Sequence, residues 1–268
     1  MNVYRENTSP RNPAMIYDEL FVPALFARWG PRVAEAAAVG AGDRVLDVGC
    51  GTGVLACAAA ERVAPDGHVV GIDPSEQMLA IARGKRADVD WQTGSAEDLP
   101  FNNASFDAVV SQFALMFFER KSVAVGEMLR VLRPRGGRLA VAVWDALDRV
   151  PGYLALMESL RALFGPSIAD AMHAPFTMGD PVALRKLFAD AGAREAEVQR
   201  HTGSVRFASI DAMVNTERAC VWTLGGMLDE QQFAQLRQAA LHALRPFVQH
   251  DGSVEFECPA LIVSWVKA

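Results

Sequence analysis

Between residues 44 and 144, short apolar segments of strand length alternate with segments of helical periodicity. Segments such as Val69–Ile72 and Leu139–Trp144 are nearly continuous in apolar residues, which is typical of strands buried on both faces. Alternation of strand and helix requires crossover connections and therefore predicts a mostly parallel sheet. The expected strands and helices are, in chain order, Arg44–Val48, Val54–Arg62, His68–Asp73, Ser75–Arg83, Val89–Gly94, Phe106–Gln112, Ser122–Leu132 and Arg138–Trp144.

Outside this stretch the alternation gives way to helical patterns, such as Pro151–Phe164 with Tyr153, Leu156 and Leu160 on one stripe. We expect one α/β domain over residues 1–268, because a prior of roughly 150 residues per domain leaves too little chain for two. Its expected parts are an N-terminal helical cap (1–40), a central core (41–144), helical insertions (145–195 and 209–248) and closing strands (195–208 and 254–267).

The composition and net charge indicate which classes of protein this chain can belong to. Hydrophobic residues make up 51 % of the chain, so a sizeable core is expected. The formal charge of −6 argues against nucleic acid or an anionic membrane as partner. Because no apolar run is long enough to span a membrane and the opening residues lack a signal-peptide core, we expect a cytoplasmic protein. The four cysteines show no CxxC pair, and no residues show metal-ligand spacing, so we expect no metal site. The oligomeric state is unknown from the sequence.

The segment Val45–Gly53 is the strongest functional signal. A buried strand runs into glycines at 49, 51 and 53, and a helix follows. Such a turn lets a ligand lie against the backbone at the positive end of a helix. Asp73 ends the next strand, where a carboxylate can accept hydrogen bonds from a ribose diol. Together these features predict an adenosine-type ligand.

Two kinds of adenosine ligand fit the glycine pattern. Residues 51–56 match the G-x-G-x-x-G/A motif of dinucleotide-binding proteins, which keeps NAD as an alternative. Asp47, however, lies at the end of the first strand, where its carboxylate would repel a pyrophosphate and attract an ammonium group. This favours a ligand that carries an amino acid.

The motifs VLDVGCGTG, GIDPSEQML, GSAEDLPF, FDAVVSQFALMFF and EMLRVLRPRGGRL cover about residues 44–144 in this order. As a set they resemble the class I S-adenosylmethionine-dependent methyltransferases, within them the small-molecule branch (type 11) that includes the ubiquinone/menaquinone-biosynthesis C-methyltransferases. The resemblance implies a Rossmann-like, seven-stranded, mostly parallel sheet whose last strand is antiparallel. It also implies S-adenosylmethionine as cofactor.

The resemblance assigns roles to individual positions. Gly49, Cys50 and Gly51 would line the methionine moiety, and Asp47 would help to hold its ammonium. Asp73 would bind the ribose hydroxyls. The other positions that the resemblance places at the cofactor are Pro74, Met78, Ala96 and Glu97 at the adenine, Ser111 and Gln112 at the methionine part, and Tyr17 in the N-terminal cap.

The chain departs from the family pattern at two positions. Ser95 stands where many relatives carry an Asp that accepts from the adenine amino group, so we expect a modest loss of affinity there. Arg135 is inserted before the glycines that precede the last core strand, which leaves the shape of that turn open. The basic stretch from Arg130 to Arg138 is interpreted as charge favourable at a helix end, not as a nucleic-acid patch.

Residues for the methyl acceptor are harder to find. Phe113 and Phe117 follow the fourth strand and would either wall an apolar pocket or belong to ordinary core, and His173 is a further candidate contact. No catalytic residue is identified. We expect methyl transfer to a small, apolar or aromatic acceptor by in-line displacement, with positioning as the main catalytic effect. The alternatives are a non-catalytic module that binds S-adenosylmethionine and an NAD-dependent oxidoreductase.

Overall fold

The computed structural model describes residues 12–220 and 223–268. The chain forms two compact units, each assembled from separated segments. Unit 1 comprises residues 1–25, 146–175 and 202–259, and unit 2 comprises residues 26–145, 176–201 and 260–268. The first eleven residues of the expected 1–40 cap lie outside the described residues. That all of 1–268 forms one domain stays a prediction.

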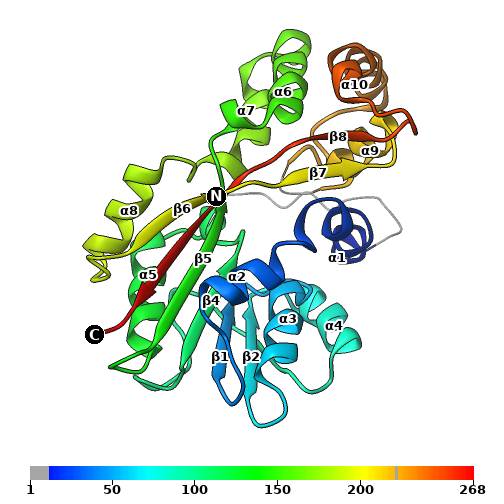
Figure 1. Ribbon diagram of the computed structural model, residues 1–268. Coiled ribbons are helices and arrows are strands. Elements are labelled where there is room, and N and C mark those ends of the chain that lie inside the picture. The colour runs from blue at the N-terminus through cyan, green and yellow to red at the C-terminus, as the bar shows by residue number, and fades with distance from the viewer. Residues whose placement is uncertain (1–11, 221–222) are drawn as a thin grey trace. The chain divides into compact units, whose positions relative to one another are not determined.

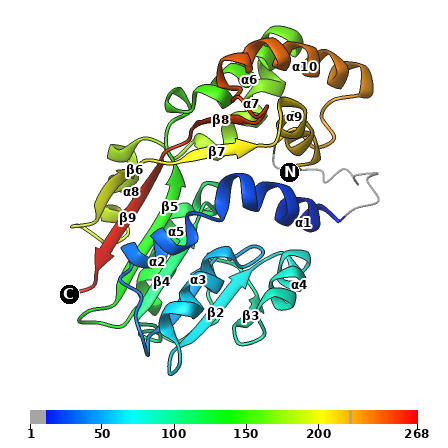
Figure 2. The ribbon, with the colours of Figure 1, turned by 45° about the vertical axis from the view of Figure 1, so that its right-hand side comes forward.

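A seven-stranded sheet forms the centre of unit 2, with the strand order β3-β2-β1-β4-β5-β9-β6. Neighbours are parallel from β3 to β5, whereas β9 runs antiparallel to both β5 and β6. Figure 2 shows β9 in red beside β5 in green. The expected Rossmann-like α/β fold with an antiparallel last strand is confirmed. The strands are β1 (Arg44–Val48), β2 (His68–Asp73), β3 (Asp90–Thr93), β4 (Ala108–Gln112), β5 (Arg138–Trp144), β6 (Glu197–His201) and β9 (Ala260–Val266).

Helices cover the sheet of unit 2, with α2 packed against α3 and α5 packed against α8. The crossover through α3 moves from β1 toward β2, and the crossover through α5 moves from β4 toward β5, in the opposite direction along the sheet (Figure 1). Because such crossovers are right-handed, these two helices cover opposite faces. The helices are α2 (Gly30–Ala36), α3 (Val54–Val63), α4 (Glu76–Lys85), η2 (Leu115–Phe117), α5 (Lys121–Val131) and α8 (Pro181–Asp190).

Unit 1 consists mainly of helices around a two-stranded antiparallel sheet, β7 (Ser204–Phe207) and β8 (Val254–Glu257). Its longest helices, α6 and α10, pack against each other. The π-helix η1 (Tyr17–Phe26) replaces the regular helices expected there, and Pro23, which has no N–H to donate, lies inside it. The other elements are α1 (Pro13–Ile16), η3 (Leu147–Arg149), α6 (Pro151–Phe164), α7 (Pro166–His173), η4 (Ala174–Phe176), α9 (Ile210–Ala219), α10 (Glu230–Ala243) and η5 (Arg245–Phe247).

Both expected closing strands are divided between the two units. The segment 195–208 forms β6 in unit 2 and β7 in unit 1, and the segment 254–267 forms β8 in unit 1 and β9 in unit 2. Pro259 separates β8 from β9, because it cannot donate a ladder hydrogen bond. In the turn before β5, the inserted Arg135 has φ of +57°. The amide of the following residue, Gly136, donates to Lys267 O at 2.8 Å.

None of the helices among residues 12–220 and 223–268 is long and apolar enough to cross a membrane. The cytoplasmic location expected from the sequence stays a prediction.

Candidate functional site

The strand order of unit 2 reverses between β1 and β4, because the chain leaves β1 toward β2 and later returns to β4 on the other side. In open parallel sheets a crevice forms outside the carboxyl ends of the strands at such a reversal. The ends of β1, β2 and β4 carry Asp47, Asp73 and Ser111. The fold thus brings these predicted residues to one edge of the sheet.

The turn after β1 is fixed by hydrogen bonds to the neighbouring strand. The amides of Gly49 and Cys50 both donate to Ile72 O, at 2.8 and 3.1 Å. Gly49 and Gly51 have φ of +72° and +53°, a region that side chains disfavour. The turn therefore depends on glycine at these positions.

The two glycines differ in what surrounds them. A Cβ on Gly49 would meet Ala114 Cβ at 2.5 Å, so this glycine serves close packing. A Cβ on Gly51 would meet nothing within 4 Å, so this glycine borders open space. Gly51 is thus the position of the turn where a ligand can approach the backbone.

The carboxylate of Asp73 links the end of β2 to the glycine turn. Its Oδ2 accepts from the Gly51 amide and its Oδ1 from the Ser75 amide, each at 2.9 Å. Burial raises the pKa of this carboxyl, and the two amides oppose that effect. Because each carboxylate oxygen has a second lone pair, Asp73 can still accept from a ligand hydroxyl.

Asp47 is the most unusual group at this edge. Its side chain is 1 % exposed, and neither carboxylate oxygen has a hydrogen-bond partner within the described structure. Burial raises the pKa of Asp47 to about 8, the nearby backbone amide of Ala56 opposes the increase, and the carboxyl of Asp73 adds to it. An unsatisfied buried carboxyl costs about 1–3 kcal/mol or more, so a buried donor or cation is the natural complement of this group.

Cys50 is close enough to Asp47 and Asp73 for both carboxyl groups to affect its thiol. Burial, with the charges of Asp47 and Asp73, raises the pKa of its thiol well above the usual value. A thiol held in this neutral form is a poor nucleophile. Cys50 is therefore unsuited to act as a nucleophile, and its place beside the cofactor stays a prediction.

The segment after β3 carries Ser95, Ala96 and Glu97. Ala96 is buried, and Ser95 Oγ accepts from the Glu97 amide at 3.1 Å. The Glu97 carboxylate accepts from the backbone amide of Arg120 at 2.9 Å and from its Nε at 3.0 Å. The Arg120 amide and guanidinium lower the pKa of Glu97. Sequence reasoning missed Arg120, because no pattern links this residue to a carboxylate 23 positions earlier.

Pro74 and Met78 lie at the start of α4, next to Asp73. Met78 is buried, whereas Pro74 is exposed. Ser75 Oγ caps the helix by accepting from the Met78 amide at 3.4 Å. The cap sets the direction in which α4 leaves Asp73.

The end of β4 is tied to its neighbours by polar side chains. The hydroxyl of Ser111 donates to Val48 O at 2.7 Å. Gln112 Nε2 donates to Phe26 O at 3.2 Å, while its buried Oε1 has no partner among the described residues. Gln112 thus offers a free acceptor at the same sheet edge as Asp47.

The acceptor candidates have different environments. Phe113 is buried and stacks on Trp144, with ring centroids 3.8 Å apart, and also contacts Phe26 and Trp29. Phe117, in contrast, is 45 % exposed. Tyr17 and His173 belong to unit 1, where Tyr17 stacks on Phe21 and His173 ends α7 with an exposed side chain. Their approach to a ligand stays a prediction.

Residues 12–220 and 223–268 contain no group of three or more His, Cys, Asp and Glu side chains arranged to hold a metal ion.

A family model and the curated relatives point to one class of enzyme. A family model described as a methyltransferase domain matches residues 45–136. The demethylmenaquinone methyltransferase of Staphylococcus carnosus is 32 % identical over an alignment of 191 residues that covers 66 % of this chain and 78 % of that protein. The same identity and coverage are found for the demethylmenaquinone methyltransferase of Staphylococcus aureus.

Solved structures show the same fold at lower identity. The YcgJ protein of Bacillus subtilis superposes with a TM-score of 0.60 at 20 % identity, over 90 % of this chain and 98 % of that one. A protein assigned as a methyltransferase of an antibiotic biosynthesis pathway in Anabaena variabilis has a TM-score of 0.64 at 16 % identity, over 90 % and 97 % of the two chains.

Proposed function

Because the chain belongs to the class I S-adenosylmethionine-dependent methyltransferases, we propose that the carboxyl edge of its sheet binds the cofactor across the reversal between β1 and β4. The chain is a methyltransferase that uses S-adenosylmethionine as methyl donor and acts on a small molecule. Family membership leaves no support for the NAD-dependent alternative. The proposal concerns which residues hold the cofactor and what kind of acceptor is methylated.

The observation that carries the proposal is the unpaired carboxyl of Asp47. Its two buried oxygens need a donor, and the methionine part of the cofactor brings an ammonium group. Bringing that cation next to Asp47 would stabilise the carboxylate and remove the cost of the unsatisfied group. The partnerless Oε1 of Gln112 is a second acceptor for the same end of the cofactor.

The glycine turn and Asp73 are proposed to bind the ribose, which is the central part of the cofactor. Gly51 leaves room for a ligand at the backbone, and the carboxylate of Asp73 retains acceptor sites for the two ribose hydroxyls. Gly49 and Cys50 complete the wall on the methionine side, where Ser111 holds the end of β1 in place.

The adenine would lie between α4 and the segment after β3. Pro74 and Met78 supply apolar contacts, the Ala96 amide donates to a ring nitrogen, and Ser95 and Glu97 lie beside it. Because the Glu97 carboxylate already accepts from Arg120, we propose that Glu97 stabilises the conformation of this segment. Tyr17 remains a candidate cofactor contact.

The bound cofactor supplies a methyl group on a sulfonium, which an acceptor atom can displace in line. The chain then contributes position and the exclusion of water, effects that together reach about 7–11 kcal/mol at best. We propose a small, apolar or aromatic acceptor, with Phe113, Phe117 and His173 as candidate contacts. The name of the staphylococcal relative, a demethylmenaquinone methyltransferase, supports an acceptor of this kind.

The proposed cofactor site is tested by calorimetric titration with S-adenosylhomocysteine, the product form of the cofactor. We expect the unmodified protein to bind it, Asp73→Asn to bind it more weakly and Asp73→Ala to lose binding. Asp90→Asn is the matched control, because this exposed carboxylate at the start of β3 bonds only the Gln92 side chain among the contacts described. Equal affinity of Asp73→Ala and the unmodified protein would refute the assignment.

The proposed acceptor is tested separately, by methyl transfer from labelled S-adenosylmethionine to a panel of phenols, quinols, amines and activated carbon acids. Transfer to apolar aromatic members supports the proposal. Transfer confined to charged, non-aromatic acceptors contradicts it.

A further inference from the structure

Residues 94–105 make up most of the connection between β3 and β4 and contain no helix and no regular strand. This connection, which we call the β3–β4 loop, includes Ala96, whose amide is proposed to contact the adenine. Because it lacks ladder partners, backbone groups such as Leu99 O and Phe101 O must find hydrogen bonds elsewhere.

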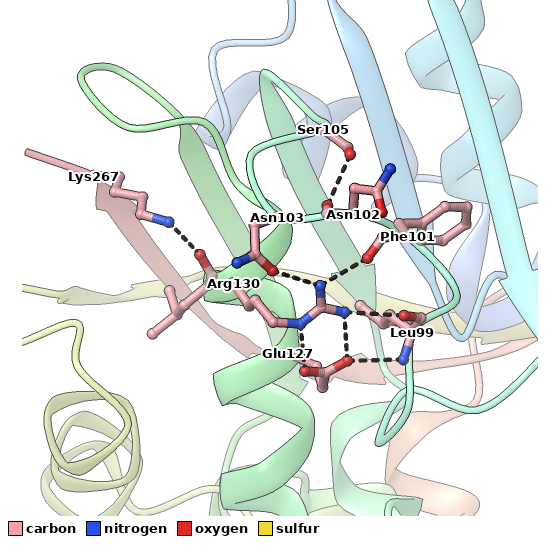
Figure 3. Close-up of polar contacts among 9 residues, drawn as sticks. Leu99, Phe101, Asn102, Asn103, Ser105, Glu127, Arg130 and Lys267 are labelled. Carbon is pink, nitrogen blue, oxygen red and sulfur yellow. Dashed lines mark hydrogen bonds and ion pairs between the residues drawn. The ribbon is translucent and has the colours of Figure 1, made fainter.

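Arg130, near the end of α5, donates hydrogen bonds to both of these carbonyl groups. Figure 3 shows its guanidinium directed into the loop. Nη1 donates to Phe101 O at 2.7 Å and to Asn103 Oδ1 at 2.9 Å, and Nη2 donates to Leu99 O at 3.0 Å. A planar guanidinium is suited to such divergent acceptors, because its donors are fixed in one plane.

Glu127 completes the arrangement one helical turn earlier. Its Oε1 and Oε2 accept from Arg130 Nε and Nη2 at 2.6 and 2.7 Å, and Oε2 also accepts from the Leu99 amide at 2.9 Å. The guanidinium of Arg130 lowers the pKa of Glu127, so the pair is ionised at neutral pH. The ion pair therefore binds both the amide and the carbonyl of Leu99, and the carbonyl also accepts from the Phe101 amide at 2.8 Å.

The same helix contacts the loop at its other end. Arg120, at the start of α5, binds the Glu97 carboxylate through its amide and its guanidinium. The loop on either side of Leu99 is therefore attached to one rigid element. Of these two attachments, only the Glu127–Arg130 pair has both side chains mostly buried, with 19 and 30 % exposed, whereas the Arg120 side chain is 65 % exposed.

We propose that Glu127 and Arg130 are positioning residues for cofactor recognition: they fix the β3–β4 loop so that the Ala96 amide is held in place for the adenine ring. The inference rests on the proposed function, because it takes the adenine side of the site from there. Neither residue touches the cofactor in this proposal. Their effect is to remove the cost of ordering the loop when the cofactor binds.

If the two residues act in adenine recognition, their substitution should weaken binding of an adenine ligand more than binding of a ligand with another base. Adenine has an acceptor at N1 and an amino group at C6, whereas hypoxanthine has an N–H at N1 and a carbonyl at C6. A fixed backbone amide discriminates between the two edges, because a donor facing an N–H is left unpaired. A loosened loop discriminates less, whereas a loss of folded protein alone lowers the bound fraction without changing the preference.

The experiment is calorimetric titration of the full chain with S-adenosylhomocysteine and with S-inosylhomocysteine, its hypoxanthine analogue. In Arg130→Met we expect the affinity for S-adenosylhomocysteine to fall by about tenfold or more, as for the loss of a charged hydrogen bond, and the ratio of the two affinities to move toward one. Glu127→Gln keeps an oxygen for the Leu99 amide but loses the ion pair, so we expect an intermediate change in the ratio.

Arg133→Met is the matched control. Arg133 follows the same helix and pairs with Asp107, which lies directly before β4 and outside residues 94–105. We expect it to retain the affinity and the ratio of the unmodified protein. Thermal unfolding of all variants separates a loss of stability from a loss of recognition.

The outcomes distinguish this inference from the proposed function. If the unmodified protein fails to bind S-adenosylhomocysteine or shows no preference for adenine, the proposed adenine side is wrong. If the unmodified protein prefers adenine and both Arg130→Met and Glu127→Gln keep the same ratio, the positioning role is overturned while the proposed site stands. If Arg133→Met changes the ratio as much as Arg130→Met does, the effect is general and the role is overturned as well.

Discussion

The amide of Gly51 donates to Oδ2 of Asp73 at 2.9 Å, and this bond joins the turn after β1 to the end of β2. The two residues are proposed to contact adjacent parts of one cofactor. A carboxylate that is already oriented by two amides needs no rearrangement to accept a ribose hydroxyl. The glycine turn and the acid thus act as one unit.

Substituting the two glycines separates packing from binding. We expect Gly51→Ala to reduce the affinity for S-adenosylhomocysteine strongly, because its Cβ would occupy the open space at the turn, while the strain of positive φ costs about 1–2 kcal/mol of stability. Gly49→Ala should cost about 1–3 kcal/mol more, because its Cβ would overlap with Ala114. Urea unfolding and calorimetry measure the two effects. Unchanged binding in a folded Gly51→Ala protein would contradict the proposed approach of the ligand.

Asp47 is expected to make the stability of the cofactor-free protein depend on pH. Its pKa is about 8 in the folded protein, above the ordinary value of 3.8 expected for the unfolded chain. Between these values the unfolded chain loses the proton that the folded protein keeps, so stability falls as the pH rises and levels off above about 8. Asp47→Asn lacks this titration. The melting temperature of the variant relative to the unmodified protein should therefore rise from pH 5 to pH 8, and parallel curves would disprove the assignment.

The same group predicts proton release on cofactor binding. In the free protein at pH 7 the carboxyl of Asp47 is mostly protonated, because its pKa is about 8. An ammonium group next to it favours the carboxylate, so binding expels a proton and the affinity rises with pH up to about 8. Titration with S-adenosylhomocysteine in two buffers of different ionisation enthalpy measures the released proton. The release should be absent in Asp47→Asn, and its persistence there would assign it to another group.

A buried polar cluster in unit 1 offers a test of that unit alone. Tyr153 donates to Glu217 Oε1 at 2.7 Å, and Thr223 donates to Oε2 at 2.9 Å. Burial raises the pKa of Glu217 to about 7, and the two donors oppose this increase. Tyr153→Phe removes one of these donors and should lower the free energy of unfolding by about 1–3 kcal/mol. The loss should be larger at pH 8 than at pH 6, because the hydroxyl bonds the ionised carboxylate more strongly.

Chemical unfolding at both pH values measures this loss. Ser159→Ala is the control on the same helix, since its hydroxyl only bonds Ala155 O in the preceding turn. A loss in Tyr153→Phe that is equal at both pH values would mean that Glu217 does not titrate in this range.

The middle of the central sheet was predictable because β1, β2, β4 and β5 are almost completely buried and therefore have nearly continuous apolar sequences. The bounds of β5 (Arg138–Trp144) and of α6 (Pro151–Phe164) agree with the expectation to the residue. The π-helix over Tyr17–Phe26 was not predicted, because its apolar residues have ordinary helical spacing. The division of the closing strands was missed because pairing partners, not local sequence, decide which sheet a strand joins.

The site shows a similar limit. Glycines and acids at strand ends carry a local pattern, so Gly49, Gly51, Asp47 and Asp73 could be located from the sequence. The contacts of Arg130 could not, because its partners lie about 30 residues earlier in a loop without periodicity. From the sequence, Arg130 was interpreted as a positive charge that is favourable at the end of a helix. The structure shows that its guanidinium instead serves the backbone of that loop.

The position of β9 has a consequence for how this chain is made. β6 pairs with β9 at the edge of the sheet, and β9 follows the other six strands of this sheet in the chain. On the ribosome, β1 to β5 can assemble while the later residues are still emerging, but β6 must wait for residues 260–266 before it has a strand to pair with. A nascent chain halted before Pro259 would thus hold an unfinished sheet with β5 exposed as its edge, which is a surface that chaperones bind and that other chains can join.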